Sequence, residues 1–213
     1  MIPLRDVIPS RSFPFINIGL IALNGIVFLF ELSIPDANFQ SFLRVFAIVP
    51  GALLRPTVLT SMFIHGGWLH FLGNMLYLWI FGDNVEDRLG HFRYLAFYVF
   101  CGIVAAVAHI YMNPMSMLPT IGASGAIAGV MGAYFVLYPQ SRILALVPLV
   151  FFFRVMEVPA TVFLGIWFVM QFFAGAMTAG VESSGIAFWA HVAGFAAGIA
   201  WVLVFRARRT LWA

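Results

Sequence analysis

Charged side chains are scarce in this chain of 213 residues, since Asp, Glu, Lys and Arg together make up 9% of it. A soluble globular protein is roughly a quarter charged. With 63% hydrophobic residues, this chain could not cover its surface with polar groups in water. The composition therefore excludes a soluble globular protein and indicates one that crosses a membrane several times.

Lysine is absent, so all eleven basic residues are arginines, and cysteine occurs once, at Cys101. The arginines are scattered at the ends of apolar segments and form no basic face, which argues against nucleic-acid binding despite a net charge of +3. A single cysteine excludes a disulfide within the chain and a cysteine-based metal site. No small-residue cleavage site follows the first apolar stretch, so we expect a retained transmembrane helix rather than a signal peptide.

Six stretches are apolar enough to cross a membrane, since a spanning helix needs about 20 mainly apolar residues. The predicted spans, within a single membrane domain of residues 1–213, are residues 15–32, 68–82, 92–112, 123–138, 160–179 and 186–205. Placing both termini in the cytoplasm leaves nine arginines inside and only Arg44 and Arg55 outside, as the positive-inside rule favours. The fold prediction is an all-α polytopic membrane protein with six transmembrane helices.

Two connections between the spans are expected to have structure of their own. The longest, about residues 33–67, is rather apolar, and we expect short helices there that lie partly in the outer leaflet. The run Ile143–Phe153, which Pro148 interrupts, is too short to span. Residues 142–158 are therefore expected to form an interfacial or re-entrant segment.

Ser124 stands at the start of the fourth predicted span, flanked by Gly122 and Gly125. These glycines and Pro119 permit a sharp entry from a loop into a helix, which leaves unsatisfied backbone N–H groups beside the serine. Those groups and the positive end of the helix dipole favour a developing oxyanion. Such a serine can act as a nucleophile, but it can also be an N-cap or a small residue for helix packing.

His191 lies within the sixth predicted span, where an ionisable side chain is costly and is a functional candidate by default. Gly194 and Gly198 share its helical face and would let another helix approach closely. The fourth span carries a similar stripe of small residues: Gly125, Gly129 and Ala133. Packed together, the two stripes would bring Ser124 and His191 within hydrogen-bond distance. The alternative is a histidine that only bonds across a helix interface.

A third polar group surrounds the start of the second span and consists of His65, His70 and Asn74. His70 and Asn74 share a helical face, and both side chains can donate hydrogen bonds to an oxyanion. His65, His70 and His191 could also bind a metal, but no nearby carboxylate completes a zinc site and there is no H-E-x-x-H pattern. The prediction is a site without a metal or another cofactor.

Taken together, these patterns resemble those of the rhomboid intramembrane serine proteases. The matching motifs, in family order, are His65-x4-His70-x3-Asn74, Gly82-x3-Glu86-x3-Gly90, Gly122-x-Ser124-Gly125 and His191-x2-Gly194-x3-Gly198. They extend from about residue 60 to residue 200 within a six-helix frame. Each motif alone is weak, whereas the set in this order is highly specific.

The resemblance implies that Ser124 is the nucleophile and that His191 is the general base and acid, in a dyad without an orienting acid. It also implies an oxyanion hole formed by His70, Asn74 and the Ser124 amide, with His65 supporting the site. The glycines expected to support the site are Gly122, Gly125, Gly194 and Gly198.

Two positions depart from the family pattern. Family members often carry an aromatic residue four positions after the serine, beneath the histidine ring, where this chain has Ala128. Another aromatic side chain must then hold the imidazole. The family's Trp-Arg pair in the first outer loop has Arg55-Pro56 as its nearest equivalent. Neither departure removes a catalytic group.

The predicted function is hydrolysis of peptide bonds in or near the transmembrane segments of single-span or polytopic membrane proteins. The expected location is a lipid bilayer, in a prokaryotic cell membrane, with the site open to the extracytoplasmic side. Water is expected to reach Ser124 through a cavity lined by His65, His70 and Asn74. By resemblance, the fifth span and residues 180–185 are expected to act as gates.

Two alternatives belong to other functional classes. A rhomboid-like protein that binds clients without cleaving them would be expected to lack the serine or the histidine. A small transporter that uses histidines as proton relays would be expected to show repeated or broken helices, or further buried carboxylates. The sequence shows neither pattern.

Overall fold

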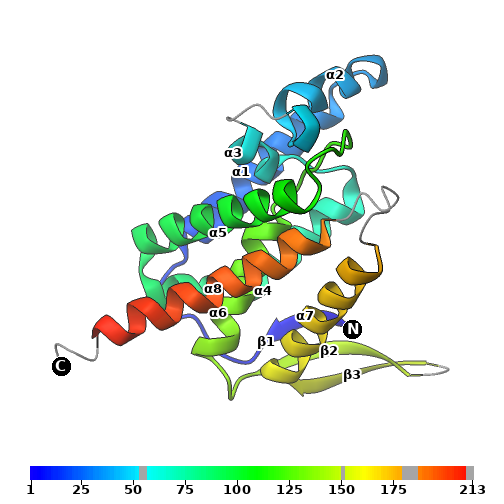
Figure 1. Ribbon diagram of the computed structural model, residues 1–213. Coiled ribbons are helices and arrows are strands. Elements are labelled where there is room, and N and C mark those ends of the chain that lie inside the picture. Colours follow the sequence, from blue (N-terminus) through cyan, green and yellow to red (C-terminus); the bar gives the residue numbers. More distant parts are fainter. Residues whose placement is uncertain (53–56, 150–151, 179–186, 210–213) are drawn as a thin grey trace.

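The computed structural model describes residues 1–52, 57–149, 152–178 and 187–209, and most of them are helical (Figure 1). The long helices are α1 (Phe15–Leu32), α4 (Trp68–Leu89), α5 (His91–Met112), α6 (Ser124–Leu137), α7 (Ala160–Met177) and α8 (Phe188–Arg209). Each of them overlaps one predicted span. Four of these helices in the described ranges, α1, α5, α7 and α8, are long and apolar enough to cross a membrane by length and composition alone.

Helix α4 extends to Leu89, seven residues beyond the predicted end at residue 82. The acidic residues in this last part do not end the helix, because the carboxylate of Glu86 is buried and paired. It accepts hydrogen bonds from the backbone N–H groups of Ile16 (3.0 Å) and Asn17 (2.7 Å) in the first turn of α1. The helix ends at Gly90, whose φ of +83° favours glycine.

Short helices occupy the connection between α1 and α4, as the sequence predicted. They are α2 (Asp36–Phe46), the 3-10 turn η1 (Pro50–Ala52), α3 (Thr57–Thr60) and the 3-10 turn η2 (Ser61–Phe63). Leu43, Ala47 and Ile64 form a small buried cluster that is separate from the main core. Arg55 and Pro56 lie outside the described residues, as do residues 180–185.

The expectation of an all-α chain is wrong, because a three-stranded antiparallel sheet is present. Strands β2 (Arg142–Leu149) and β3 (Phe152–Pro159) pair with each other, and β1 (Ile2–Asp6) pairs with β2 on the other side. The segment predicted as interfacial or re-entrant is thus a β-hairpin. An apolar run of this length fits a strand as well as a helical segment. Here every second residue at the start of β2, Ile143 and Ala145, is buried in the core.

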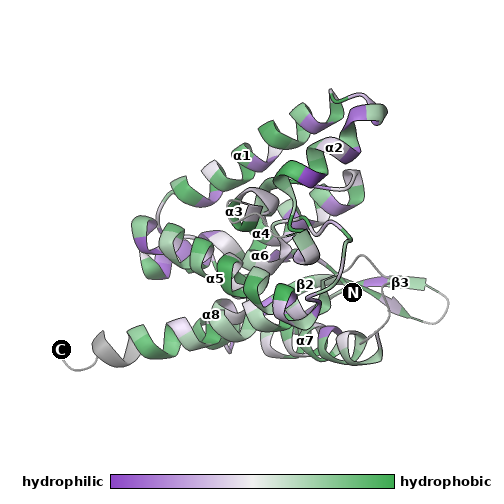
Figure 2. Cartoon of the chain, turned by 45° about the horizontal axis from the view of Figure 1, so that its top comes forward, coloured by the Kyte–Doolittle hydropathy of each residue, from purple (hydrophilic) through white to green (hydrophobic). Residues whose placement is uncertain are grey.

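Helix α6 lies at the centre of the bundle and contacts α4, α5, α7 and α8. Hydrophobic residues predominate along the long helices, whereas many hydrophilic ones lie near helix ends and on α2 (Figure 2). A Cβ atom added to Gly198 would lie 1.9 Å from the Gly129 carbonyl oxygen, and one added to Gly194 would lie 2.1 Å from that of Gly125. The backbones of α6 and α8 therefore touch, and no larger residue fits at these positions.

The fourteen residues of α6 make it the shortest of the long helices. At 1.5 Å per residue it is about 21 Å long, well short of the roughly 30 Å hydrocarbon core of a bilayer. Its last turns are held by the Tyr134 hydroxyl group, which donates to Asp6 (2.7 Å) and lies 2.8 Å from the Ser141 hydroxyl group. With that end fixed, Ser124 begins the helix inside the bundle rather than at its surface.

Candidate active site

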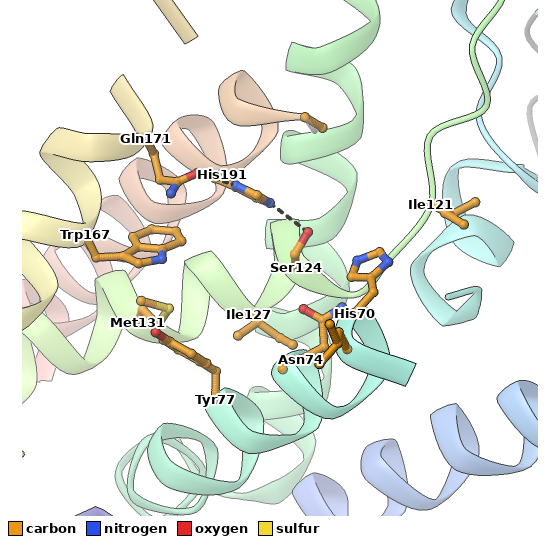
Figure 3. Close-up of a pocket in the computed structure, with 13 residues that line it drawn as sticks. His70, Asn74, Tyr77, Ile121, Ser124, Ile127, Met131, Trp167, Gln171 and His191 are labelled. Carbon is orange, nitrogen blue, oxygen red and sulfur yellow. Dashed lines mark hydrogen bonds between the residues drawn. The ribbon is translucent and has the colours of Figure 1, made fainter. Parts of the chain in front are cut away.

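Ser124 and His191 meet where α6 and α8 begin. The Ser124 Oγ atom lies 2.8 Å from His191 Nε2, which is a hydrogen bond (Figure 3). Ser124 is the first residue of α6, and His191 lies in the first turn of α8. The close approach of these helices at the glycine stripes brings the two side chains together, as the stripes in the sequence led us to expect.

The other side of the imidazole faces α7. His191 Nδ1 lies 2.7 Å from the Oε1 atom of Gln171, and the ring centroid is 5.8 Å from that of Trp167 at an interplanar angle of 40°. Trp167 and Gln171 are four residues apart, so one face of α7 presents both to the histidine (Figure 3). An aromatic side chain other than residue 128 therefore contacts the imidazole.

Neither Trp167 nor Gln171 is among the site residues predicted from the sequence. A signal was available for Gln171, because it is the only strongly polar side chain in the helix Ala160–Met177. Polar residues in such segments are uncommon and commonly face a partner within the protein. The sequence held no signal that its partner would be the Nδ1 atom of His191.

His70 and Asn74 lie on α4, across the cavity from His191, and both pack against Gly122 (Figure 3). Gly122 has a φ of +118°, and a Cβ atom there would lie 2.6 Å from His70 Nε2 and 3.6 Å from Asn74 Nδ2. Asn74 Nδ2 is buried and has no hydrogen-bond partner within the described part of the chain. The donor groups of α4 thus stand beside the turn that presents Ser124.

His65 occupies a different position from the one expected. Its side chain is 1% exposed and lies behind His70, with 5.2 Å between the two ring centroids, and it does not line the cavity. The expectation that His65 lines the route of water is therefore wrong. Its backbone N–H donates to the Glu31 carboxylate (3.0 Å), and burial lowers the pKa of the His65 ring to about 4, so the ring is neutral at pH 7.

A cavity of about 470 Å³ opens beside the Ser124–His191 pair. Its polar lining comes from Ser124, His191, His70, Asn74 and Gln171. The rest is mainly apolar and aromatic, including Tyr77, Ile127, Met131 and Trp167. A space of this kind can hold a hydrophobic side chain next to the serine while the polar groups contact a peptide bond.

A comparison with protein families agrees with this arrangement. The model of the Rhomboid domain matches residues 52–208, which is most of the chain. The chain belongs to the rhomboid family. The matched range includes α3, η2 and every residue of the cavity, whereas α2 lies before it.

Curated relatives with similar sequences come from several kinds of organism. The chain is 33% identical over 140 residues to presenilin-associated rhomboid-like protein A, mitochondrial, of Danio rerio. This alignment covers 63% of this chain and 36% of the relative. It is 32% identical over 130 residues to rhomboid protease GluP of Bacillus subtilis (59% and 24%). It is 32% identical over 95 residues to rhomboid protein 1, mitochondrial, of Saccharomyces cerevisiae (43% and 28%).

The alignments cover little more than a third of these relatives' own lengths at most. Two of the three relatives are named as mitochondrial and one comes from a bacterium. Family membership and the apolar helices make this a membrane-spanning protein. The prediction of a prokaryotic cell membrane receives no support from these names.

Proposed function

We propose that this rhomboid-family chain is an intramembrane serine endopeptidase that cleaves peptide bonds in or near the transmembrane segments of other membrane proteins. The observation that carries the proposal is the 2.8 Å contact between Ser124 Oγ and His191 Nε2 at the edge of a cavity enclosed by apolar helices. A serine hydroxyl group is a weak nucleophile until a neighbouring base removes its proton, and this pair has the required geometry.

In the proposed reaction, Ser124 Oγ attacks the carbonyl carbon of the scissile bond while His191 Nε2 takes the hydroxyl proton. The histidine then gives this proton to the leaving amine, and a water molecule, activated in the same way, hydrolyses the acyl-enzyme. The reaction requires only the side chains of this protein, the substrate and water. The same two atoms therefore serve both half-reactions.

His70, Asn74 and the backbone N–H of Ser124 are proposed to bind the oxyanion of the tetrahedral intermediate. The support is the Nδ2 atom of Asn74, which is buried without a hydrogen-bond partner among the described residues and lies next to the turn that carries Ser124. A donor that is already desolvated and held in place loses little on reaction and gains a charged acceptor in the transition state. We assign His65 a supporting role behind His70, and Gly122, Gly125, Gly194 and Gly198 the role of permitting the close packing.

We further propose that all six long helices span the bilayer in one domain formed by residues 1–213, with both termini cytoplasmic and the cavity open to the extracytoplasmic side. In support, the arginines assigned to the cytoplasm in the described part of the chain lie on β1, in the loop before α1, in the last turn of α4, in the first turn of α5, on the β2–β3 hairpin and at the end of α8. The cavity lies at the opposite ends of α4, α6 and α8. This is the charge asymmetry that the positive-inside rule describes.

The direct test is to incubate the purified protein in detergent and in vesicles with a panel of single-span membrane proteins. Cleavage by the native chain and its loss in Ser124→Ala, together with labelling of Ser124 by a fluorophosphonate, is the expected result. Clean Ser124→Ala protein that still cleaves would contradict the proposal. Stable binding of the panel without cleavage or labelling would favour a rhomboid-like binding protein instead.

A further inference from the structure

The side chain of Gln171 occupies the position at which serine hydrolases commonly hold an orienting acid. Its Oε1 lies 2.7 Å from His191 Nδ1, and the opposite ring nitrogen, Nε2, lies 2.8 Å from Ser124 Oγ. The three side chains come from α7, α8 and α6 and form one line (Figure 3). The histidine is thus hydrogen-bonded on both sides, in a chain whose sequence motifs indicate a two-residue dyad.

This arrangement determines which ring nitrogen carries the proton. An amide oxygen can only accept a hydrogen bond, so Nδ1 must donate its hydrogen to Gln171. In a neutral imidazole the other nitrogen then has a free electron pair, and Nε2 accepts the hydrogen bond from the Ser124 hydroxyl group. This is the tautomer that a general base needs, because the opposite one would present an N–H to the serine.

We propose that Gln171 is a positioning residue that holds His191 in its catalytically competent tautomer and orientation, together with the Trp167 ring. The inference rests on the proposed protease function. The amide replaces a carboxylate at a place where charge would be costly, since the other cavity-lining residues include many apolar ones. Trp167 contacts the imidazole face from the same side of α7, which restricts rotation of the ring.

If Gln171 positions His191, the helix that carries it, α7, contributes to catalysis. Helix α7 makes many fewer contacts with α6 than α8 does, and much of its surface is exposed. Movement of α7 away from α8 would separate Oε1 from Nδ1 and release the ring. Activity would then depend on where α7 lies, although α7 carries neither the nucleophile nor the base.

The test compares three variants with the native protein. Gln171→Leu removes the acceptor at similar size, Gln171→Glu keeps an oxygen acceptor at the same reach, and Gln140→Leu makes the same change at an exposed turn far from the site. We expect Gln171→Leu to lower kcat by roughly tenfold with KM nearly unchanged, the scale of one hydrogen bond. Gln171→Glu should retain most of the kcat at high pH, and Gln140→Leu should behave as the native protein.

The pH profile supplies a readout that a purely structural role would not move. A carboxylate beside Nδ1 favours the charged imidazolium, so the midpoint of kcat/KM should move to higher pH in Gln171→Glu. Other titratable groups near His191 are His70 and Tyr77 on α4 and His109 on α5, and they are unchanged in these variants. An unchanged midpoint with full kcat in both Gln171 variants would overturn the proposal.

A spectroscopic measurement separates this inference from the proposed function. In protein labelled with 15N-histidine, with the His191 signals identified by their loss in His191→Ala, native His191 should show a protonated Nδ1 and a bare Nε2. Gln171→Leu should show a mixture of tautomers. If the native protein shows protonated Nε2, Gln171 is not the positioning residue, whether or not cleavage is detected. If the tautomer is as expected but no substrate is cleaved and Ser124 is not labelled, only the protease function fails.

Discussion

The two ends of α6 carry polar groups that are used in opposite ways. At the sheet end, which we define by Asp6, Asn84, Tyr134 and Ser141, the polar side chains are paired with one another: Asn84 Nδ2 donates to Asp6 (2.9 Å), and the Tyr134 hydroxyl group donates to the same carboxylate. At the cavity end, defined by Ser124, His191, His70 and Asn74, the Nδ2 atom of Asn74 has no hydrogen-bond partner in the described chain.

The difference shows how one apolar helix can serve stability at one end and chemistry at the other. A buried polar group that is fully bonded stabilises the fold and has little left to offer a ligand. A buried donor without a partner costs free energy in the resting protein, and that cost is recovered when a suitable acceptor arrives. Substitutions at the sheet end should therefore change stability, and those at the cavity end should change turnover.

The largest effect is expected from the two residues that exchange the proton. Ser124→Ala and His191→Ala should each abolish measurable cleavage, while the melting temperature in detergent changes little. Because members of a catalytic unit are not additive, the double variant should be no worse than either single one. A double variant far less active than both would show that the two residues do not act as a unit.

Two asparagines on α4 allow a matched test of the comparison itself. Asn74→Ala should lower kcat by roughly ten- to a thousandfold, the range for one oxyanion donor, with stability almost unchanged or improved. Asn84→Ala should destabilise by roughly 1–3 kcal/mol, because it leaves the half-buried Asp6 with one donor fewer, while the folded fraction keeps its kcat. Turnover and thermal unfolding measured on the same preparations give both values. The comparison fails if the two effects are exchanged.

The contact of α6 with α8 provides the next effect in size. In Gly198→Val the new side chain would overlap the Gly129 carbonyl group and push α8 away. A displacement of about 1 Å at Ser124 and His191 can cost on the order of a hundredfold in rate, so activity and melting temperature should both fall. Val204→Gly, at an exposed position further along α8, should mainly affect stability. Full activity in Gly198→Val would refute this packing as the source of the geometry.

The smallest effect concerns the charge at the sheet end. Burial raises the pKa of Asp6 above its ordinary value, and the hydrogen bond from Tyr134 only partly opposes this. Since the folded pKa lies above the unfolded one, the contribution of Asp6 to stability is present at low pH and is lost as the pH rises through the folded pKa. Asp6→Asn keeps an oxygen acceptor and should reduce this loss. Melting temperatures of both proteins between pH 4 and pH 8 would show whether the slopes differ.

Much of this architecture could be predicted from the sequence because it depends on strong local signals. The lengths of the apolar stretches predicted the long helices, and most helix ends lie within a few residues of the predicted ones. Stripes of glycine and alanine predicted that α6 and α8 would pack with their backbones in contact. The order of His70, Asn74, Ser124 and His191 in the motifs indicated the rhomboid family, to which the chain belongs. These features require only the residue types and their spacing.

Other features depend on partners distant in the chain, and the tertiary structure alone revealed them. Strand β1 pairs with β2 across more than a hundred residues, and nothing local to Ile2–Asp6 specifies that register. Glu86 continues a helix instead of ending it because the first turn of α1 supplies its donors. Trp167 contacts the His191 ring in place of an aromatic residue at position 128, and Gln171 forms a hydrogen bond with that ring. Both contacts exist only because α7 packs beside α8. Local composition determines which segments are apolar helices, whereas pairing of buried polar groups is decided by which helices become neighbours.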